Sequence, residues 1–330
     1  MNDRERFLKT LKFEKADRVP YFEQYIREDT VERWRKEGLP RGVDIEEYFH
    51  LDHREVIPLK LSYREMNSRF DYPIESESDL DRFRAFLDGA RKKAYPRNWK
   101  KLVEKYRRRD YPVGLGAWES GILQFLGVID SLSLTRACLL LCDNPPLAHR
   151  IMDAAADYLM KGIEPALEQV DVDFAYFTEP IAGSNGPVIS PAMFREFVIP
   201  RYKRIVSLLK EHRVDIIILR SFGNIEVLLP DMVKAGINGL WLTETVPSNM
   251  DYRKIRKRYG RKLALIGGID SNVLTRDKET IRQEIFEKAP PLMKGGGYIP
   301  TIDNRARAHI PFENFVYYRT LIEEISAQSF

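Results

Sequence analysis

Cysteine and long apolar runs are both scarce in this chain of 330 residues. Two cysteines, Cys138 and Cys142, are too few for a disulfide scaffold and favour a reducing compartment. The longest apolar runs, such as Val214–Leu219, are far shorter than the roughly 20 residues that a membrane-spanning helix needs. The charged N-terminus leads into an amphipathic helix and does not resemble a signal peptide. We therefore expect a cytoplasmic protein with no membrane partner.

Charge of one sign is not in excess either. Lys and Arg number 53 against 49 Asp and Glu, which leaves a formal net charge of +4 and excludes a nucleic-acid-binding tail. Hydrophobic residues make up 44% of the chain and charged residues 31%, which is typical of a folded globular protein. The length suits one barrel domain. We expect a single domain over residues 1–330 and no nucleic-acid partner.

Eight short apolar runs bounded by turn residues predict eight strands. They are Val19–Tyr25, Val56–Tyr63, Tyr111–Trp118, Asp173–Glu179, Val214–Arg220, Asn238–Thr243, Lys262–Ile269 and Gly297–Ile302. Some runs, such as Ile216–Leu219, are apolar at every position. Strands of that kind are buried on both faces, as parallel strands covered by helices must be.

Helical segments separate most of these runs. Ser190 as N-cap and Pro191 at the first helical position predict the start of a helix that continues through Met193–Glu211. Further helices are predicted over Ser131–Cys142, Leu147–Gln169, Asn224–Ala235, Tyr252–Tyr259, Thr280–Met293 and Phe312–Ser326.

The repeated strand–helix pattern predicts an α/β fold, a single (β/α)8 barrel with an N-terminal helix. The polar interval Arg64–Asp110 is interpreted as helices at the rim of the barrel. The alternative, an open doubly wound sheet, would carry a Gly-x-Gly-x-x-Gly turn after an early strand, and the sequence has none.

A parallel barrel holds its site at the carboxyl ends of the strands, and Arg220 ends the most apolar predicted strand. Because arginine cannot be neutralised, it needs an anion or a wet opening. We predict that it binds a carboxylate or phosphate, helped by Arg305 and Arg307. An internal ion pair of Arg220 with Glu179 or Glu244 is the alternative.

Two strand-end residues are candidates for proton transfer. Glu179 follows an aromatic strand, where burial raises the pKa of a carboxyl group, although a salt bridge to a neighbouring arginine explains it equally well. His309 is the one histidine near a predicted strand end, and histidine is a residue type suited to proton transfer, with a surface-loop histidine as the alternative. The other strand-end residues predicted to bind substrate are Tyr25, Trp118, Phe222, Asn224, Glu244 and Asp303.

Cys138 and Cys142 lie four residues apart on a predicted helix that also contains Leu139–Leu141. This composition indicates a buried helix with reduced thiols in the core. A metal pair is the lesser alternative, since no further His or Cys ligands are near in the sequence.

The segment Gly186–Lys203 (GPVISPAMFREFVIPRYK) resembles a signature of the uroporphyrinogen decarboxylase-like superfamily. Further segments that resemble it are Arg4–Leu11, Asp17–Pro20, Ala235–Leu240, Gly267–Asp270 and Gly296–Pro300. The resemblance runs over almost the whole chain and implies a (β/α)8 barrel. The superfamily contains uroporphyrinogen decarboxylases and corrinoid-linked methyltransferases.

The chain departs from both branches at the positions that carry their chemistry. The methyltransferases it resembles hold zinc with a His-x-Cys pair after strand five and a later cysteine. Here that pair falls on Arg220 and Phe222, and Ile299–Asp303 has no cysteine, so we expect no zinc.

The decarboxylases carry an arginine-rich motif after strand one, where this chain offers only Arg27. Their catalytic aspartate is implied near Asp52, although the spacing is not a clean match, and the family's late histidine falls on Asn304.

Three functions remain open. The expected one is methyl transfer between a corrinoid, as substrate or co-substrate, and a non-thiol acceptor, without zinc. The alternatives are a carboxyl-lyase acting on a porphyrinogen or a smaller polycarboxylate, and a non-catalytic tetrapyrrole- or anion-binding protein. The partners that follow are an anionic small molecule or tetrapyrrole, a corrinoid protein, and a second copy of the chain in a homodimer implied by the resemblance.

Overall fold

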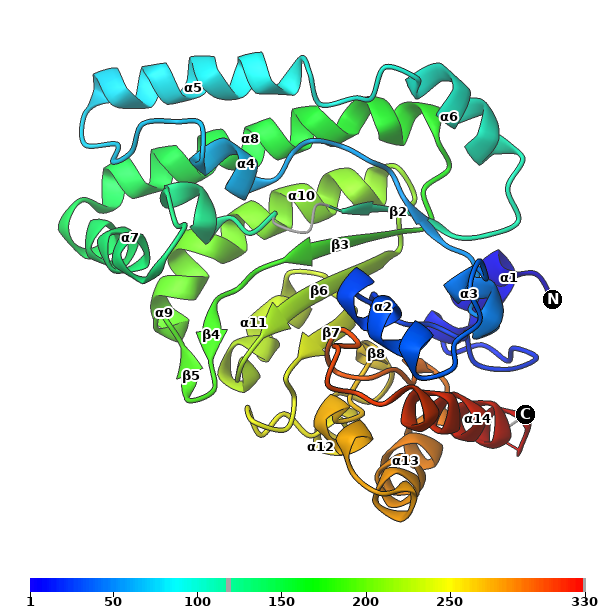
Figure 1. The fold of residues 1–330 in the computed structure, drawn as a ribbon. Coiled ribbons are helices and arrows are strands. Elements are labelled where there is room, and N and C mark those ends of the chain that lie inside the picture. Colours follow the sequence, from blue (N-terminus) through cyan, green and yellow to red (C-terminus); the bar gives the residue numbers. More distant parts are fainter. Residues whose placement is uncertain (117–119, 329–330) are drawn as a thin grey trace. The chain divides into compact units, whose positions relative to one another are not determined.

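The computed structural model describes residues 1–116 and 120–328 (Figure 1). The chain divides into two compact units. The first unit comprises Met1–Arg54, Asp110–Pro112 and Gly239–Phe330. The second unit comprises Glu55–Arg109 and Val113–Asn238. Each unit contains parallel strands and helices, which confirms the predicted α/β class.

Four parallel strands form the sheet of the second unit. In spatial order they are β1 (Glu55–Val56), β2 (Val113–Gly116), β3 (Phe174–Thr178) and β6 (Ile216–Phe222). The strands β4 (Ala182–Gly183) and β5 (Gly186–Pro187) form a separate antiparallel pair. The helices of this unit are α4 (Tyr63–Asn67), α5 (Glu77–Arg91), α6 (Trp99–Arg107), η1 (Leu123–Leu126), α7 (Ser131–Asp143), α8 (Pro145–Gln169), α9 (Pro191–Met193), η2 (Phe194–Val198), α10 (Ile199–Glu211), η3 (Glu226–Leu228) and α11 (Leu229–Lys234).

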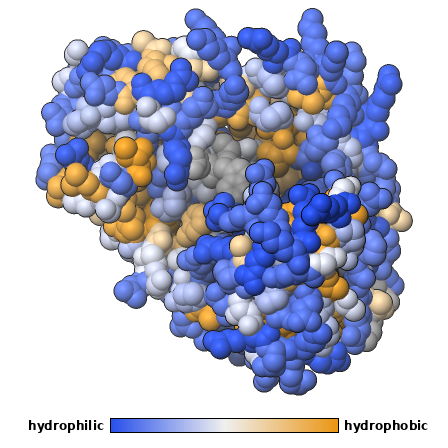
Figure 2. All heavy atoms as spheres, in the orientation of Figure 1, coloured by the Kyte–Doolittle hydropathy of each residue, from blue (hydrophilic) through white to orange (hydrophobic). Residues whose placement is uncertain are grey.

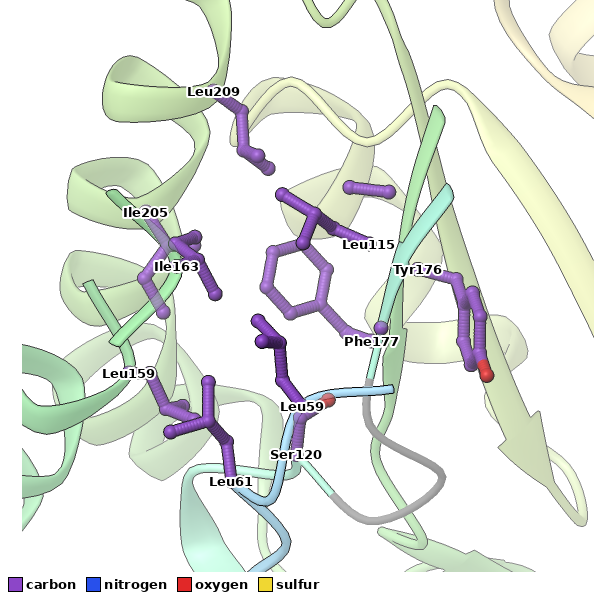
Figure 3. A pocket seen from close by; sticks show the side chains of 12 residues that line it. Leu59, Leu61, Leu115, Ser120, Leu159, Ile163, Tyr176, Phe177, Ile205 and Leu209 are labelled. Carbon is purple, nitrogen blue, oxygen red and sulfur yellow. The ribbon is translucent and has the colours of Figure 1, made fainter. Parts of the chain in front are cut away.

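The two faces of this sheet differ in what covers them. Phe177 points into an apolar cavity of about 40 Å³ between the strands and the aliphatic side chains of α8 and α10, whereas Tyr176 points to the other side (Figure 3). On β2, a Cβ added to Gly114 would lie 2.3 Å from the Phe174 ring, and one added to Gly116 would lie 2.5 Å from the Tyr176 ring. The rings of β3 therefore lie over β2 only because that strand has glycine at both positions.

Three parallel strands form the sheet of the first unit. They are β7 (Gly239–Thr243), β8 (Ala264–Ile266) and β9 (Tyr298–Ile299). Two isolated parallel bridges, Ile269 with Ile302 and Ile26 with Ala306, extend the pairing. The helices of this unit are α1 (Asp3–Leu11), α2 (Glu28–Lys36), α3 (Ile45–Tyr48), α12 (Tyr252–Tyr259), η4 (Gly260–Lys262), η5 (Ser271–Thr275), α13 (Lys278–Met293) and α14 (Phe312–Gln328).

The first of the eight predicted strands is wrong, because residues 19–25 form none. Pro20 has no N–H to donate, and the neighbouring N–H groups of Val19 and Tyr21 donate to the side chains of Ser326 and Asp52 at 3.3 and 3.2 Å. These backbone donors are satisfied without a strand ladder. The second predicted strand is reduced to Glu55–Val56, and the other six runs each contain a strand.

The predicted helices are present, and the helix start predicted at Ser190 and Pro191 is confirmed. The Ser190 hydroxyl accepts the N–H of Met193 at 3.1 Å, with Pro191 at the first helical position. The wide turns of η2 precede Pro200, which has no N–H to bond the carbonyl of Glu196.

The interval Arg64–Asp110 is helical as predicted, and its helix α5 packs on α8 (Figure 1). No helix within residues 1–116 and 120–328 combines the length and apolarity needed to cross a bilayer. The closed eight-stranded barrel and the single domain stay predictions.

Candidate functional site

Arg220 lies near the carboxyl end of β6, in register with Thr178 of β3. Partners in a parallel pair project to the same face, and successive residues of a strand alternate between faces. Arg220 and Thr178 therefore share the face of Tyr176, away from α8 and α10. Because the Arg220 side chain is only 1% exposed, this face of the sheet carries a deeply buried permanent cation.

Glu179 follows β3 and lies toward the helices. Its Oε2 accepts the N–H of Ile122 at 2.9 Å and the hydroxyl of Tyr202 in α10. Its side chain is fully buried, and burial raises its pKa to about 7. The predicted alternative of an ion pair between Arg220 and Glu179 is wrong, because the carboxyl group bonds Ile122 and Tyr202 on the other side of the sheet.

Tyr202 is a partner of Glu179 that the sequence did not predict. Its hydroxyl holds Glu179, and its ring stacks on Phe177 with centroids 5.2 Å apart. The pKa of Tyr202 is raised well above its usual value by burial and by the neighbouring Glu179. The one signal available was its place inside the Gly186–Lys203 segment. Together the two residues fix the loop at Ile122 against α10, and proton transfer by Glu179 stays a prediction.

Asp303 connects two strand ends in the first unit. Its Oδ2 accepts the N–H and the hydroxyl of Thr245, which follows β7, at 2.8 and 2.9 Å. Its Oδ1 accepts the N–H of Ser271, which follows β8, at 3.1 Å. Asp303 is 2% exposed, so its carboxylate organises the carboxyl ends of β7 and β8.

Glu244 lies beside this carboxylate with a left-handed backbone (φ 59°). Its Oε1 accepts Nδ2 of Asn304 at 3.3 Å and lies 3.8 Å from Nη2 of Arg307. The structure thus brings together four of the residues discussed above: Glu244, Asp303, Asn304 and Arg307.

The other predicted site residues are more exposed than Arg220 and Asp303. Tyr25, Arg305 and His309 are exposed in the first unit. Phe222 and Asn224 are half-buried in the second unit, where Asn224 Oδ1 accepts the N–H of Glu226 at 3.1 Å. Trp118 lies outside the described residues.

Two residues implied by the resemblance to decarboxylases are engaged in local ion pairs. Asp52 pairs with Arg18 and, at 3.3 Å, with Arg6 of α1. Arg27 precedes α2 and forms a two-pronged pair with Asp29 at 2.9 and 3.0 Å.

Glu23 forms a second buried cluster in the first unit. It accepts the Tyr318 hydroxyl at 2.7 Å, Nη1 of Arg319 at 3.1 Å and the Thr301 hydroxyl at 2.8 Å. Burial raises its pKa, while Arg319 opposes that rise. The sequence does not reveal this cluster, because α14 lies almost 300 residues from Glu23 in the chain.

No three His, Cys, Asp or Glu side chains gather as a metal site within the described ranges. The predicted independence from zinc is untested and stays a prediction. The sequence-based prediction of a buried helix with core cysteines is wrong, because Cys142 is exposed and Cys138 half-buried.

The family model "Uroporphyrinogen decarboxylase (URO-D)" matches residues 124–315. A uroporphyrinogen decarboxylase of Pseudomonas fluorescens (strain Pf0-1) is 28% identical over 197 residues, 57% of this chain and 51% of that protein. One of Legionella pneumophila (strain Paris) is 31% identical over 163 residues, 47% of this chain and 45% of that protein. The chain spans about half the length of these curated relatives.

A solved structure described as a methyltransferase from Methanosarcina mazei is similar over 98% of this chain and 99% of that chain. Its TM-score is 0.65 and its sequence identity 18%. At this identity the likeness shows a shared fold.

Proposed function

The chain belongs to the uroporphyrinogen decarboxylase family, and on this premise we propose that it transfers a methyl group between a corrinoid and a non-thiol acceptor without zinc. The corrinoid is a substrate or co-substrate, free or carried by a protein. In such a transfer both electrons of the cobalt–carbon bond stay on cobalt. The acceptor's lone pair forms the new bond to carbon, and its proton passes to a base or to water.

The observation that carries this choice over decarboxylation is the state of Arg27 and Asp52. A decarboxylase of the family's kind needs a cation to hold substrate carboxylates and a catalytic aspartate. Here Arg27 is held by Asp29, and Asp52 by Arg6 and Arg18. A carboxylate that already bonds two guanidinium groups is a poor partner for a substrate.

Arg220 supplies the anion-binding group of the proposal. It lies at a strand end with Thr178 beside it, and in a closed barrel this position opens to the mouth. A buried guanidinium suits a carboxylate or a phosphate. We assign it to an acidic group of the corrinoid or the acceptor. His309, Arg305 and Arg307 are exposed in the first unit and remain candidates for proton transfer and for further anion contacts.

Decarboxylation is the second candidate, because the matched curated relatives are named uroporphyrinogen decarboxylases. Incubation with methylcobalamin and amine or phenol acceptors, in parallel with uroporphyrinogen III, separates the two. Acceptor-dependent loss of the methyl–cobalt absorbance, with uroporphyrinogen unchanged, supports methyl transfer. Formation of less carboxylated porphyrinogens overturns it in favour of the lyase. Ligand binding without either reaction identifies a tetrapyrrole-binding protein.

Metal analysis of the purified protein tests the absence of zinc separately. Methyl transfer that persists after chelation, in protein without stoichiometric zinc, is the expected result. Loss of transfer on chelation, with recovery on adding zinc, would contradict the proposal.

A further inference from the structure

Basic side chains gather at the amino ends of β8 and β9 in the first unit. Lys262 lies two residues before β8, and Gly297 lies directly before β9. The segments 9–15, 256–262 and 294–297, which form this basic surface, carry nine basic residues and one acid, Glu14. The whole chain has 53 basic against 49 acidic residues. Its small net charge therefore conceals a strong local excess of positive charge.

Phe13 brings the three segments of the basic surface together. The guanidinium groups of Arg256 and Arg261 lie over its ring, 4.8 and 5.3 Å from the ring centroid. Nη2 of Arg261 also donates to the Phe13 carbonyl at 2.8 Å. A Cβ added to Gly297 would overlap the same ring, so the turn that leads into β9 passes directly against it. Cations from three distant stretches of the chain are thus neighbours in space.

Arg256 adds a half-buried cation beneath this surface. Its Nη1 and Nη2 donate to the carbonyls of Gly260 and Gly297 at 3.0 and 2.7 Å. Burial lowers its pKa to about 10, and no acid of the described residues opposes that fall. Arg256 is still charged at neutral pH. Because its hydrogen bonds go to neutral carbonyls, its charge adds to the positive potential outside the protein.

The other cations of the basic surface reach into solvent. Seven of them are exposed: Lys12, Lys15, Lys257, Arg258, Arg261, Lys262 and Lys294. Like charges held this close repel one another, and an anionic partner relieves that repulsion. Since the cations are spread over three segments, they suit an extended chain of negative charges better than one small anion.

The surroundings of the cations favour an acidic protein segment over other polyanions. Single-stranded nucleic acids stack their bases on free aromatic rings, whereas the Phe13 ring is covered by two guanidinium groups. Lipid-binding surfaces combine cations with an exposed apolar group. The large apolar side chains that are exposed in the described part of the chain all lie outside the three segments. The face of the first unit seen in Figure 2 is mostly hydrophilic as well.

We propose that the basic surface docks a segment of another protein that is rich in aspartate and glutamate. Five of its seven exposed cations are lysines, whose flexible stems let each ammonium group reach a separate carboxylate. The surface lies at the amino ends of β8 and β9, whereas the reaction proposed above uses the carboxyl ends of the strands. The docking proposal is therefore independent of that reaction.

Fluorescence anisotropy of a labelled peptide of glutamate, aspartate and glycine, titrated with the full chain, tests this proposal. We expect saturable binding at low salt. The dissociation constant should rise roughly tenfold or more between about 50 and about 300 mM salt, because salt screens exposed charges. A peptide of the same length with glutamine and asparagine in place of the acids should not bind.

A double charge reversal, Lys257→Glu with Lys262→Glu, locates the binding on the chain. It is expected to raise the dissociation constant of the acidic peptide roughly tenfold or more, since it places like charges together. Lys161→Glu with Lys203→Glu is the matched control, because these exposed lysines of α8 and α10 lie in the second unit. The control changes the net charge equally and should leave the affinity unchanged. Circular dichroism verifies that each variant is folded.

Three results would overturn the proposal. One is no binding of the acidic peptide at low salt. Another is equal weakening in both double variants, or in neither, since the peptide would then respond to net charge or bind elsewhere. The third is tighter binding of single-stranded RNA or of phosphatidylserine-containing vesicles than of the peptide, with loss in Lys257→Glu/Lys262→Glu. That outcome would make the basic surface a nucleic-acid or lipid surface.

Discussion

Thr178 and Arg220 stand opposite each other in register on neighbouring parallel strands. This pairing places the Arg220 guanidinium on the face of Tyr176. Glu179, the residue that follows Thr178, lies on the other side of the sheet, toward Tyr202 and the helices. Two charged residues at adjacent strand ends are thereby separated by the sheet itself. The cation lies on the face of Tyr176, and the acid holds the loop at Ile122 against α10.

Replacing Arg220 with alanine is expected to weaken the binding of a carboxylated tetrapyrrole. The loss of a charge-assisted hydrogen bond amounts to about 1.5–3 kcal/mol, which is roughly a ten- to hundredfold rise in the dissociation constant. Titration calorimetry with uroporphyrin III measures it. Arg204→Ala, which removes an exposed arginine paired with Asp153 and Asp157, is the control. Unchanged affinity in folded Arg220→Ala would contradict the anion site.

Glu179 is expected to make stability depend on pH. Its pKa is about 7 in the folded protein against a usual 4.5, so between these values the folded state keeps a proton that the unfolded state has lost. Stability from this group is full below pH 4.5 and is lost as the pH rises through 7. The change is on the order of 3 kcal/mol at 1.36 kcal/mol for each pKa unit.

Urea unfolding of the wild type and of Glu179→Gln across this pH range measures the effect. The amide stays neutral, so the variant lacks this fall in stability. Glu168→Gln changes an exposed carboxylate of α8 and should retain it. Equal pH profiles for the wild type and Glu179→Gln would show that the buried acid does not hold its proton.

Local signals in the sequence predicted local structure well. Ser190 and Pro191 gave the start of their helix correctly, because a cap depends on neighbours within one turn. The strand predicted at residues 19–25 is absent, because the side chains of Ser326 and Asp52 accept backbone N–H groups there. No local pattern in the sequence reveals these distant acceptors. The apolar composition of α7 predicted burial, yet Leu132 and Leu139 are 60% and 54% exposed.

In the candidate site, too, local features could be predicted from the sequence and distant partners could not. Arg220 could be predicted from its place at the end of an apolar strand, and its face follows from alternation along β6. The partners of Glu179 and Glu23 could not, because Tyr202, Tyr318 and Arg319 reach them from helices far along the chain.

Asp303→Asn is expected to destabilise the first unit. The carboxylate accepts three hydrogen bonds from Thr245 and Ser271, and an amide cannot accept all of them with the same oxygens. A buried donor left without its acceptor costs about 1–3 kcal/mol, so unfolding should need about that much less free energy. Measuring the ligand affinity of the same variant tests the predicted substrate-binding role separately. Wild-type stability with lost affinity would mean that Asp303 serves the ligand alone.

Gly116→Ala and Gly89→Ala are expected to change stability in opposite directions. The new methyl group at Gly116 would stand 2.5 Å from the Tyr176 ring, whereas nothing lies within 4 Å of the corresponding position at Gly89 in α5. Displacing a buried ring typically costs about 1–3 kcal/mol, while alanine in a helix is worth up to about 1 kcal/mol over glycine. Neither glycine has a positive φ, so backbone strain does not enter the comparison. Urea unfolding at one pH measures both, and a Gly116→Ala variant as stable as Gly89→Ala would show that the Tyr176 ring swings aside and that β2 does not need glycine there.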